Sequence, residues 1–361
     1  MLRFFIFISL ISILGVFLLA GGNKKTGKML YIFVTFLLFL AVMSLRAVWV
    51  GADTSFYAGL FRFIGKVPVD MYMEGGFLWF SKMLSYVSQE PQWLFFATGF
   101  IILSAVFRLV YKYSFLPALS VLIYACDLFS FHLTGMRQAL ATAFLVFSFD
   151  FIIKKKPVWF LLCVAAAFMF HKSAVIFLIA YPLSCIEINK RNITTALAAS
   201  VAGVVFFGLF SLVMFYIFPS YEVYVGSVWY GNETKLATIM RLCIASVIFT
   251  ISYFLYKKRK AALDEGGKFI FNSLLWISLM TVCVFILSFK ATLFERAAFY
   301  FSCFNMILLP NAIGLVNEKG TKAIFVISVI LFFILYAGVV FYFRPEWTEV
   351  IPYSFFWEPR P

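Results

Sequence analysis

Long apolar runs recur along almost the whole chain, and they constrain the fold more than any other feature of the sequence. A helix needs roughly 20 apolar residues to cross about 30 Å of hydrocarbon. Charged residues make up 13% of the chain, whereas a soluble domain carries about 25%. So few charges cannot cover a water-soluble surface, which excludes a soluble enzyme, a DNA-binding protein and a disordered tail. Suitable apolar runs lie near residues 3–20, 29–46, 92–110, 115–131, 135–153, 157–171, 173–186, 193–218, 237–256, 269–289, 297–316 and 323–342.

These runs predict an all-α fold, a polytopic transmembrane helix bundle of about twelve spans, with residues 1–361 as one integral membrane domain. The runs at 157–171 and 173–186 are short and share a polar break at His171-Lys172, so we expect two helices that meet at one membrane face. The six cysteines stand singly in apolar runs, without C-x-x-C spacing. The sequence therefore predicts neither a zinc site nor a disulfide framework.

The basic residues indicate how the chain is oriented. The formal net charge is +14, but the lysines and arginines occur in short clusters between apolar runs, which is typical of membrane topology rather than of nucleic-acid binding. If all twelve runs cross, an even number of spans separates neighbouring clusters, so every cluster can face the cytoplasm. The clusters are Lys24-Lys25-Lys28, Arg108 with Lys112, Lys154-Lys155-Lys156, Lys190-Arg191, Lys257-Lys258-Arg259-Lys260 with Lys268, and Lys319 with Lys322.

This parity requires that residues 76–88 do not cross the membrane. That stretch is short and carries Lys82, so we expect a re-entrant or amphipathic helix on the outer face. Both termini then lie outside the cytoplasm. Residues 47–91 form a long extracytoplasmic loop and residues 343–361 an extracytoplasmic tail. A loop of that size, in a bundle otherwise joined by short turns, is a favoured place for function.

Charged residues within a span or at its end are costly, and a charge at the helix centre costs about 2.5–3.5 kcal/mol. Outside the basic clusters, ten charged or histidine residues call for an explanation, and all ten lie at the predicted outer ends of helices or in outer loops. They are Arg46, Asp53, Glu74, Asp127, Arg137, His171, Lys172, Arg241, Glu295 and Arg296. Their location on one side predicts a shared polar cavity just below the outer surface.

Arg137 opens a predicted helix after a glycine, where backbone N–H groups already favour anions. An arginine there can hold a phosphate with two parallel hydrogen bonds, or it can simply extend towards the membrane surface. Arg296 follows Glu295 and permits the same two readings, phosphate binding or a local ion pair. Arg241, one turn inside its helix, is a third candidate cation.

His171 ends a predicted helix at the same outer side, where it can donate to a phosphate, move a proton or satisfy a turn. Asp53 and Glu74 are the carboxylates best placed as general bases, with solvated loop acids as the alternative. The only other histidine is His132, so a multi-histidine metal site is not predicted. Motifs for metal-dependent or nucleophile-elbow chemistry do not occur.

A set of short motifs in a fixed order resembles the EpsG family of bacterial exopolysaccharide and O-antigen polymerases, the Wzy-type enzymes. The resemblance runs from about Arg46 to the C-terminus. The motifs are Gly51-x-Asp53-x-x-x-Tyr57, Glu74-Gly-Gly, Met136-Arg137-Gln-Ala-Leu-Ala141, Phe170-His171-Lys-Ser-Ala174, Arg296-x-x-x-Tyr300 and Ile351-Pro-Tyr353-x-x-Phe356.

The resemblance implies a GT-C-like membrane glycosyltransferase of the bacterial inner membrane, with its active site facing the periplasm or exterior. The implied donor and acceptor are undecaprenyl-diphosphate-linked oligosaccharides, with a chain-length regulator as a further partner and no metal or other cofactor. The enzyme would transfer the growing glycan to the non-reducing end of the next lipid-linked repeat. We expect Arg137, His171 and Arg296 to bind the leaving diphosphate and Asp53 or Glu74 to act as the base. Further candidate substrate ligands are Arg46, Arg241 and Tyr300.

Three other classes stay open at the level of sequence. A lipid-linked oligosaccharide flippase would place charges at the bilayer midplane and repeat its two halves. An O-antigen ligase would carry a large outer loop in the later half of the chain. A membrane O-acyltransferase would need its histidine on the cytoplasmic donor path, whereas the predicted topology places His171 outside.

Overall fold

The computed structural model describes residues 1–19, 24–66, 73–217, 236–291 and 293–360. Within these ranges the chain forms helices and turns, and the only strand-like pairing is a single bridge between Arg46 and Phe355. The all-α prediction is therefore confirmed. Parts of the predicted outer loops, residues 67–72 and 218–235, lie outside the described residues.

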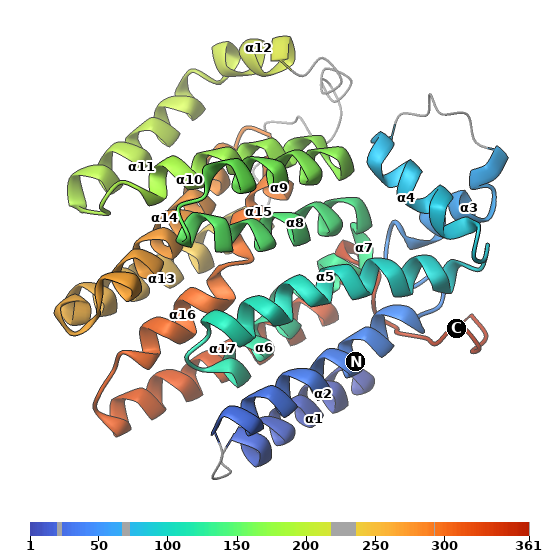
Figure 1. The fold of residues 1–361 in the computed structure, drawn as a ribbon, viewed down its shortest axis with the longest axis horizontal. Helices are drawn as coiled ribbons and strands as arrows, with labels where there is room; N and C mark the ends of the chain where they lie inside the picture. The colour runs from blue at the N-terminus through green and yellow to red at the C-terminus, as the bar shows by residue number, and fades with distance from the viewer. Residues whose placement is uncertain (20–23, 67–72, 218–235, 292, 361) are drawn as a thin grey trace. The chain divides into compact units, whose positions relative to one another are not determined.

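Nine helical segments of the described chain are long and apolar enough to cross a membrane (Figure 1). One of them, Pro117–Thr134, contains a π-helical turn, and another, Phe294–Gly314, joins two helices. The nine are α1 (Leu2–Leu19), α2 (Lys24–Ser44), α5 (Pro91–Tyr113), α6 with α7 (Pro117–Ile123 and Phe129–Thr134), α8 (Met136–Ile153), α13 (Leu236–Arg259), α14 (Glu265–Leu287), α15 with α16 (Leu293–Ser302 and Asn305–Gly314) and α17 (Lys319–Phe343).

Three of the twelve predicted spans do not form one long helix. The run at 157–171 is α9 (Pro157–Phe170), whose 14 residues extend about 21 Å, less than the apolar thickness of a bilayer. The run at 173–186 is a 3₁₀ helix (Lys172–Ile179) followed by α10 (Ala180–Ser184). The run at 193–218 is α11 (Lys190–Val205) and α12 (Phe207–Ile217), with an 82° bend between them. The predicted parity does not depend on the first two of these runs, because two consecutive runs return the chain to the same side whether both cross or neither does. The orientation of the chain stays a prediction.

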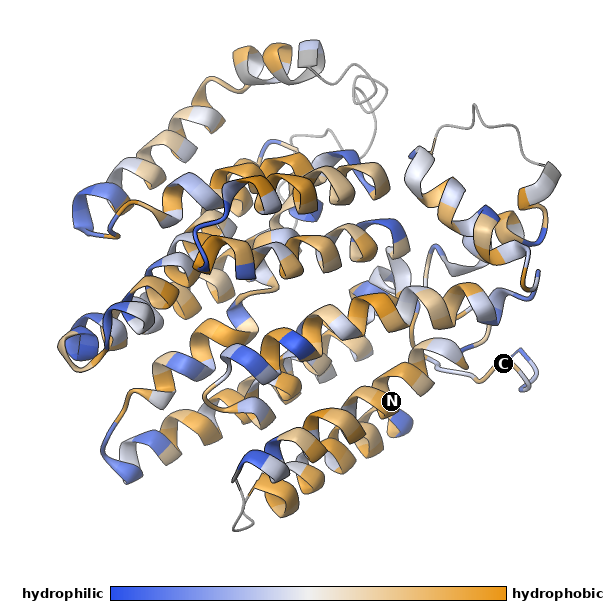
Figure 2. Cartoon of the chain, viewed as in Figure 1, coloured by the Kyte–Doolittle hydropathy of each residue, from blue (hydrophilic) through white to orange (hydrophobic). Residues whose placement is uncertain are grey.

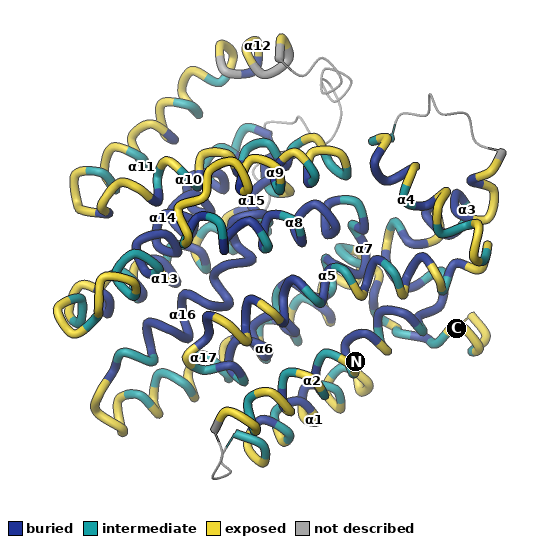
Figure 3. Tube along the Cα trace, in the orientation of Figure 1, coloured by how far each residue is buried: buried dark blue, intermediate teal, exposed yellow. Residues whose placement is uncertain are grey.

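The chain divides into two compact units. Unit 1 comprises residues 1–151, 158–175 and 316–361, and unit 2 comprises residues 152–157 and 176–315. Within unit 1, α1 and α17 leave many large apolar side chains exposed, as expected for helices that contact lipid (Figure 3). Within unit 2, α14 is buried along most of its length and forms the centre of the unit.

In unit 1, hydrophilic residues gather towards the helix ends, while the helix middles are mostly hydrophobic (Figure 2). At one end Lys28 donates to the Ser114 carbonyl at 3.0 Å, and Lys112 and Arg108 both pair with Asp150. The three basic residues, Lys28, Arg108 and Lys112, belong to the predicted cytoplasmic clusters.

The opposite end of unit 1 is closed by the C-terminal tail. Ala47 N–H donates to the Ser354 carbonyl at 2.9 Å, and Phe356 N–H donates to Leu45 at 2.9 Å. Arg3 joins the same end through a two-pronged ion pair with Glu358, at 2.7 and 2.9 Å. The tail therefore fixes the segment that leads from α2 into the site described next.

Candidate functional site

Two short helices follow α2 in unit 1 and lie at the end opposite the basic clusters. They are α3 (Thr54–Arg62) and α4 (Gly75–Ser85), and α4 occupies the position of the predicted amphipathic helix. The first turn of α4 lies against the last turn of α9. A methyl group added at Gly76 would stand 2.5 Å from the Met169 carbonyl oxygen, so only glycine permits this approach. The contact brings Glu74, just before α4, next to His171, just after α9.

Glu74 is the centre of a cluster that joins three distant parts of the chain. Its Oε1 accepts from Nδ1 of His171 at 2.9 Å, and from the Lys172 backbone N–H at 3.4 Å. Its Oε2 accepts from Nη1 of Arg137, the second residue of α8. The structure therefore brings together three of the predicted site residues, Glu74, Arg137 and His171.

Tyr57 of α3 completes the cluster. Its hydroxyl oxygen accepts from Nε of Arg137 at 3.1 Å, and its ring packs edge-on against Phe77 of α4. Arg137 is thus held on two sides, by a phenol and by a carboxylate. Burial raises the pKa of the Tyr57 hydroxyl, and the charge of Arg137 opposes this only in part. The hydroxyl therefore stays protonated and neutral beside the arginine.

Opposing effects set the ionisation of Glu74. Burial raises the pKa of its carboxyl, but the His171 hydrogen bond and the charge of Arg137 outweigh burial, so the pKa falls from 4.5 to about 2. Glu74 is consequently a carboxylate at any physiological pH and a weak base. The side chains of Arg137 and His171 remain 24% and 17% exposed, so an incoming ligand can reach both.

Asp53 lies immediately before α3, and its backbone carbonyl accepts from the Tyr57 N–H at 3.2 Å. Its half-buried carboxylate makes no capping hydrogen bond to the helix, and its charge acts on Tyr57. Asp53 is therefore beside the Glu74 cluster.

Arg46, a predicted substrate ligand, is completely buried. Its guanidinium donates to the carbonyls of Met43 and Leu133, the latter at 3.1 Å, and stacks over the Phe95 ring at 4.2 Å. Burial lowers the pKa of Arg46 to about 9. In this structure the arginine connects the end of α2 to the end of α7.

We expect Arg46→Ala to destabilise the protein, because it removes two hydrogen bonds from a charged donor to buried carbonyls, each worth about 1.5–3 kcal/mol. The measurement is the thermal unfolding midpoint in detergent, compared with Arg62→Ala, which removes an exposed arginine from α3. Equal midpoints for the two variants would show that Arg46 has no structural role.

The remaining predicted residues belong to unit 2. Arg241 of α13 pairs with Glu295 of α15 at 2.7 Å, and Thr238 also donates to Glu295. Glu295 thus has a partner on another helix. Arg296 is exposed and Tyr300 is fully buried.

Tyr57 and Gly76 complete the unit 1 site, and the sequence predicted no role for either. The signal for Tyr57 was its position one helical turn after Asp53. The sequence contains no signal for the contact of Gly76 with Met169, because that contact depends on how two helices pack. Among the described residues no group of three or more histidine, cysteine, aspartate or glutamate side chains could hold a metal ion.

Comparison with known proteins identifies a family for this chain. The model of the EpsG family matches residues 29–355, nearly the whole chain. No curated protein and no solved structure matches the chain. The family match covers the Glu74 cluster of unit 1 and the Arg241–Glu295 pair of unit 2. The chain therefore belongs to the EpsG family, a family of Wzy-type polymerases.

Proposed function

We propose that the protein is a bacterial polysaccharide polymerase that transfers a growing glycan from undecaprenyl diphosphate to the non-reducing end of another lipid-linked repeat. The observation that carries this proposal is the cluster in which Glu74 holds Arg137 and His171 side by side. Two partly exposed, positively polarised side chains fixed by one carboxylate form a suitable site for a departing diphosphate. EpsG membership supports the general activity.

The reaction breaks the bond between the anomeric carbon of the glycan and a diphosphate oxygen, and the diphosphate leaves with the electron pair. The acceptor hydroxyl forms the new bond to that carbon and loses its proton to a base. Because negative charge builds on the leaving diphosphate, fixed cations beside it lower the barrier, and this is usually the largest catalytic contribution.

We assign the residues of unit 1 to these tasks. Arg137 binds the diphosphate through its Nη2 edge, because its Nε and Nη1 contact Tyr57 and Glu74. His171 donates to the diphosphate from Nε2, and the Glu74 carboxylate accepts from its Nδ1. Glu74 orients both side chains.

Asp53 is the preferred base, because the contacts with Arg137 and His171 make Glu74 a weak proton acceptor. In unit 2, Arg296 stays a predicted diphosphate ligand, and Arg241 and Tyr300 stay predicted substrate ligands. We place the Glu74 cluster on the periplasmic or outer face of the inner membrane, because the basic clusters lie at the opposite end of unit 1.

The test is deletion of the chromosomal gene, followed by electrophoresis of the surface polysaccharide. Loss of a polymerase leaves single repeat units on the surface, whereas loss of a flippase or ligase leaves none. Complementation with the intact gene should restore the ladder of long chains, and Asp53→Asn should not. A deletion strain that keeps its ladder would contradict the proposal.

The pKa of Glu74 predicts how stability depends on pH. A folded-state pKa below the ordinary 4.5 stabilises the fold wherever the unfolded carboxyl would be ionised, so the contribution is complete above about pH 5 and is lost as the pH falls through 2. We expect Glu74→Gln to lower the free energy of unfolding by about 3 kcal/mol at pH 7. The difference from wild type, measured by unfolding in detergent, should shrink between pH 4.5 and 2. A difference that grows on acidification would contradict this role for Glu74.

A further inference from the structure

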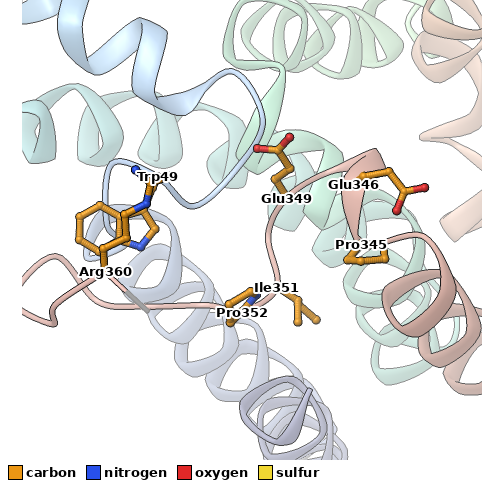
Figure 4. Close-up of a pocket in the computed structure, with 7 residues that line it drawn as sticks. All are labelled: Trp49, Pro345, Glu346, Glu349, Ile351, Pro352 and Arg360. Carbon is orange, nitrogen blue, oxygen red and sulfur yellow. The ribbon is translucent and has the colours of Figure 1, made fainter.

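A pocket lies beside the C-terminal tail of unit 1, and none of its lining residues belongs to the Glu74 cluster (Figure 4). Its volume is about 350 Å³, at the small end of the range of about 300–1,000 Å³ for small-molecule sites. Trp49 and Arg360 lie at one end and Pro345 and Glu346 at the other, with Glu349 and Pro352 between them.

The wall that carries Glu349 is held in one conformation. The Glu349 N–H donates to the Pro345 carbonyl, and the Glu349 carbonyl accepts from the Gly51 N–H, both at 2.8 Å. Glu349 has a φ of 50°, in the left-handed region that a non-glycine residue adopts only when its surroundings impose it. Such outliers cluster at ligand sites, and here the backbone presents a carboxylate at a preformed pocket.

A second backbone hydrogen bond, next to the one between Gly51 and Glu349, links the pocket to the proposed catalytic segment. The Ala52 N–H donates to the Thr348 carbonyl at 3.0 Å, and Asp53 is the next residue. Four residues further on, Tyr57 contacts Arg137. A ligand in the pocket would therefore be held by the segment that positions Asp53.

The chemistry of the lining distinguishes this pocket from the diphosphate site. Glu346 and Glu349 supply two negative charges and Arg360 one positive charge, so the lining lacks the excess positive charge that a diphosphate needs. Glu346 also lies 3.6 Å from Arg344, but both side chains remain more than half exposed. Carboxylate and guanidinium groups bind hydroxyl groups, while an indole ring and prolines provide apolar surface for the C–H face of a sugar.

We propose that this pocket binds one sugar residue, neutral or amino, of the glycan on which the enzyme acts, an inference that rests on the proposed function. The site would hold the chain near Asp53 between transfers.

The experiment measures saccharide binding to the purified full-length protein. The probe is the oligosaccharide repeat released by mild acid from the host's own polysaccharide, followed by saturation-transfer NMR. We expect Glu349→Gln and Trp49→Phe to weaken binding by about tenfold, the value of one lost hydrogen bond to a charged group or of comparable packing. Glu90→Gln, an exposed acid before α5, is the matched control and should bind as wild type does.

Two outcomes would overturn the inference. One is equal binding by wild type, Glu349→Gln and Glu90→Gln. The other is a thermal shift with calcium chloride alone that Glu349→Gln abolishes, without any saccharide signal, which would identify a cation site. Arg137→Ala keeps the two proposals separable, because it should bind the saccharide normally. Saccharide binding that depends on Glu349, together with normal polymer in Arg137→Ala, would refute the proposed diphosphate site but still support the saccharide pocket.

Discussion

We expect the Arg137→Ala variant to lose the ladder of long polysaccharide and to accumulate single repeats. Removing one preorganised group that stabilises developing negative charge costs about 10²–10³ in rate, enough to abolish visible chain growth. Arg137 also links Tyr57 to Glu74, so its loss removes the arginine contact of the Glu74 carboxylate and leaves its contacts with His171 and the Lys172 backbone. The measurement is electrophoresis of surface polysaccharide from a deletion strain that carries the variant.

Arg62→Ala is the matched control, because it removes an exposed arginine from the helix that carries Tyr57. We expect it to support normal polymer. Arg137→Lys should fail like alanine, since a single ammonium group cannot make the planar, forked contacts to Tyr57 and Glu74 and still bind a phosphate. Full-length polymer in Arg137→Ala, at wild-type protein levels, would remove Arg137 from the mechanism.

The sequence predicts a spanning helix best where an uninterrupted apolar run is long enough to cross the membrane. In the part of the chain that the structure describes, nine long runs form helices of spanning length. The run that ends at His171 differs, because its backbone departs from the α-helix after Phe170, and His171 then turns towards Glu74. Hydropathy marks such a break without showing whether the two short helices cross.

Much of the Glu74 cluster could be predicted, because a charge near apolar surroundings is costly and needs a partner. Glu74, Arg137 and His171 are three of the ten residues predicted to share a cavity, and Glu74 contacts the other two, but nothing in the sequence separates them from Arg46. One carbonyl partner of Arg46, that of Met43, is local, but the other, that of Leu133, comes close only through tertiary packing.

Helix geometry disfavours an ion pair between Glu295 and its neighbour Arg296. Adjacent residues on a helix point in different directions, whereas residues three or four apart share a face. Glu295 and Arg296 both lie in α15, so a local pair between them is unfavourable, and Glu295 instead pairs with Arg241 of α13. The identity of that partner depends on tertiary packing, and the sequence alone does not determine it.

We expect Gly76→Ala to reduce chain growth strongly although it changes no polar group. Its new methyl group would stand 2.5 Å from the Met169 carbonyl oxygen and 2.8 Å from two Met169 carbon atoms, distances that no real contact tolerates. The first turn of α4 must therefore move away from α9, taking Glu74 away from His171. A displacement of about 1 Å at a catalytic group can cost about 10²-fold in rate. The measurement is the polymer ladder from the complemented deletion strain.

Gly75→Ala is the matched control, because Gly75 lies in the same helical turn but an added methyl group would meet no atom within 4 Å. Alanine favours a helix over glycine by about 1 kcal/mol at either position, so the two variants share any effect on helix formation and differ only in the contact with Met169. A short or missing ladder in Gly76→Ala alone would show that the close approach of α4 to α9 positions Glu74. Equal ladders in both variants, at equal protein levels, would mean that chain growth does not require the Glu74–His171 contact as the structure draws it.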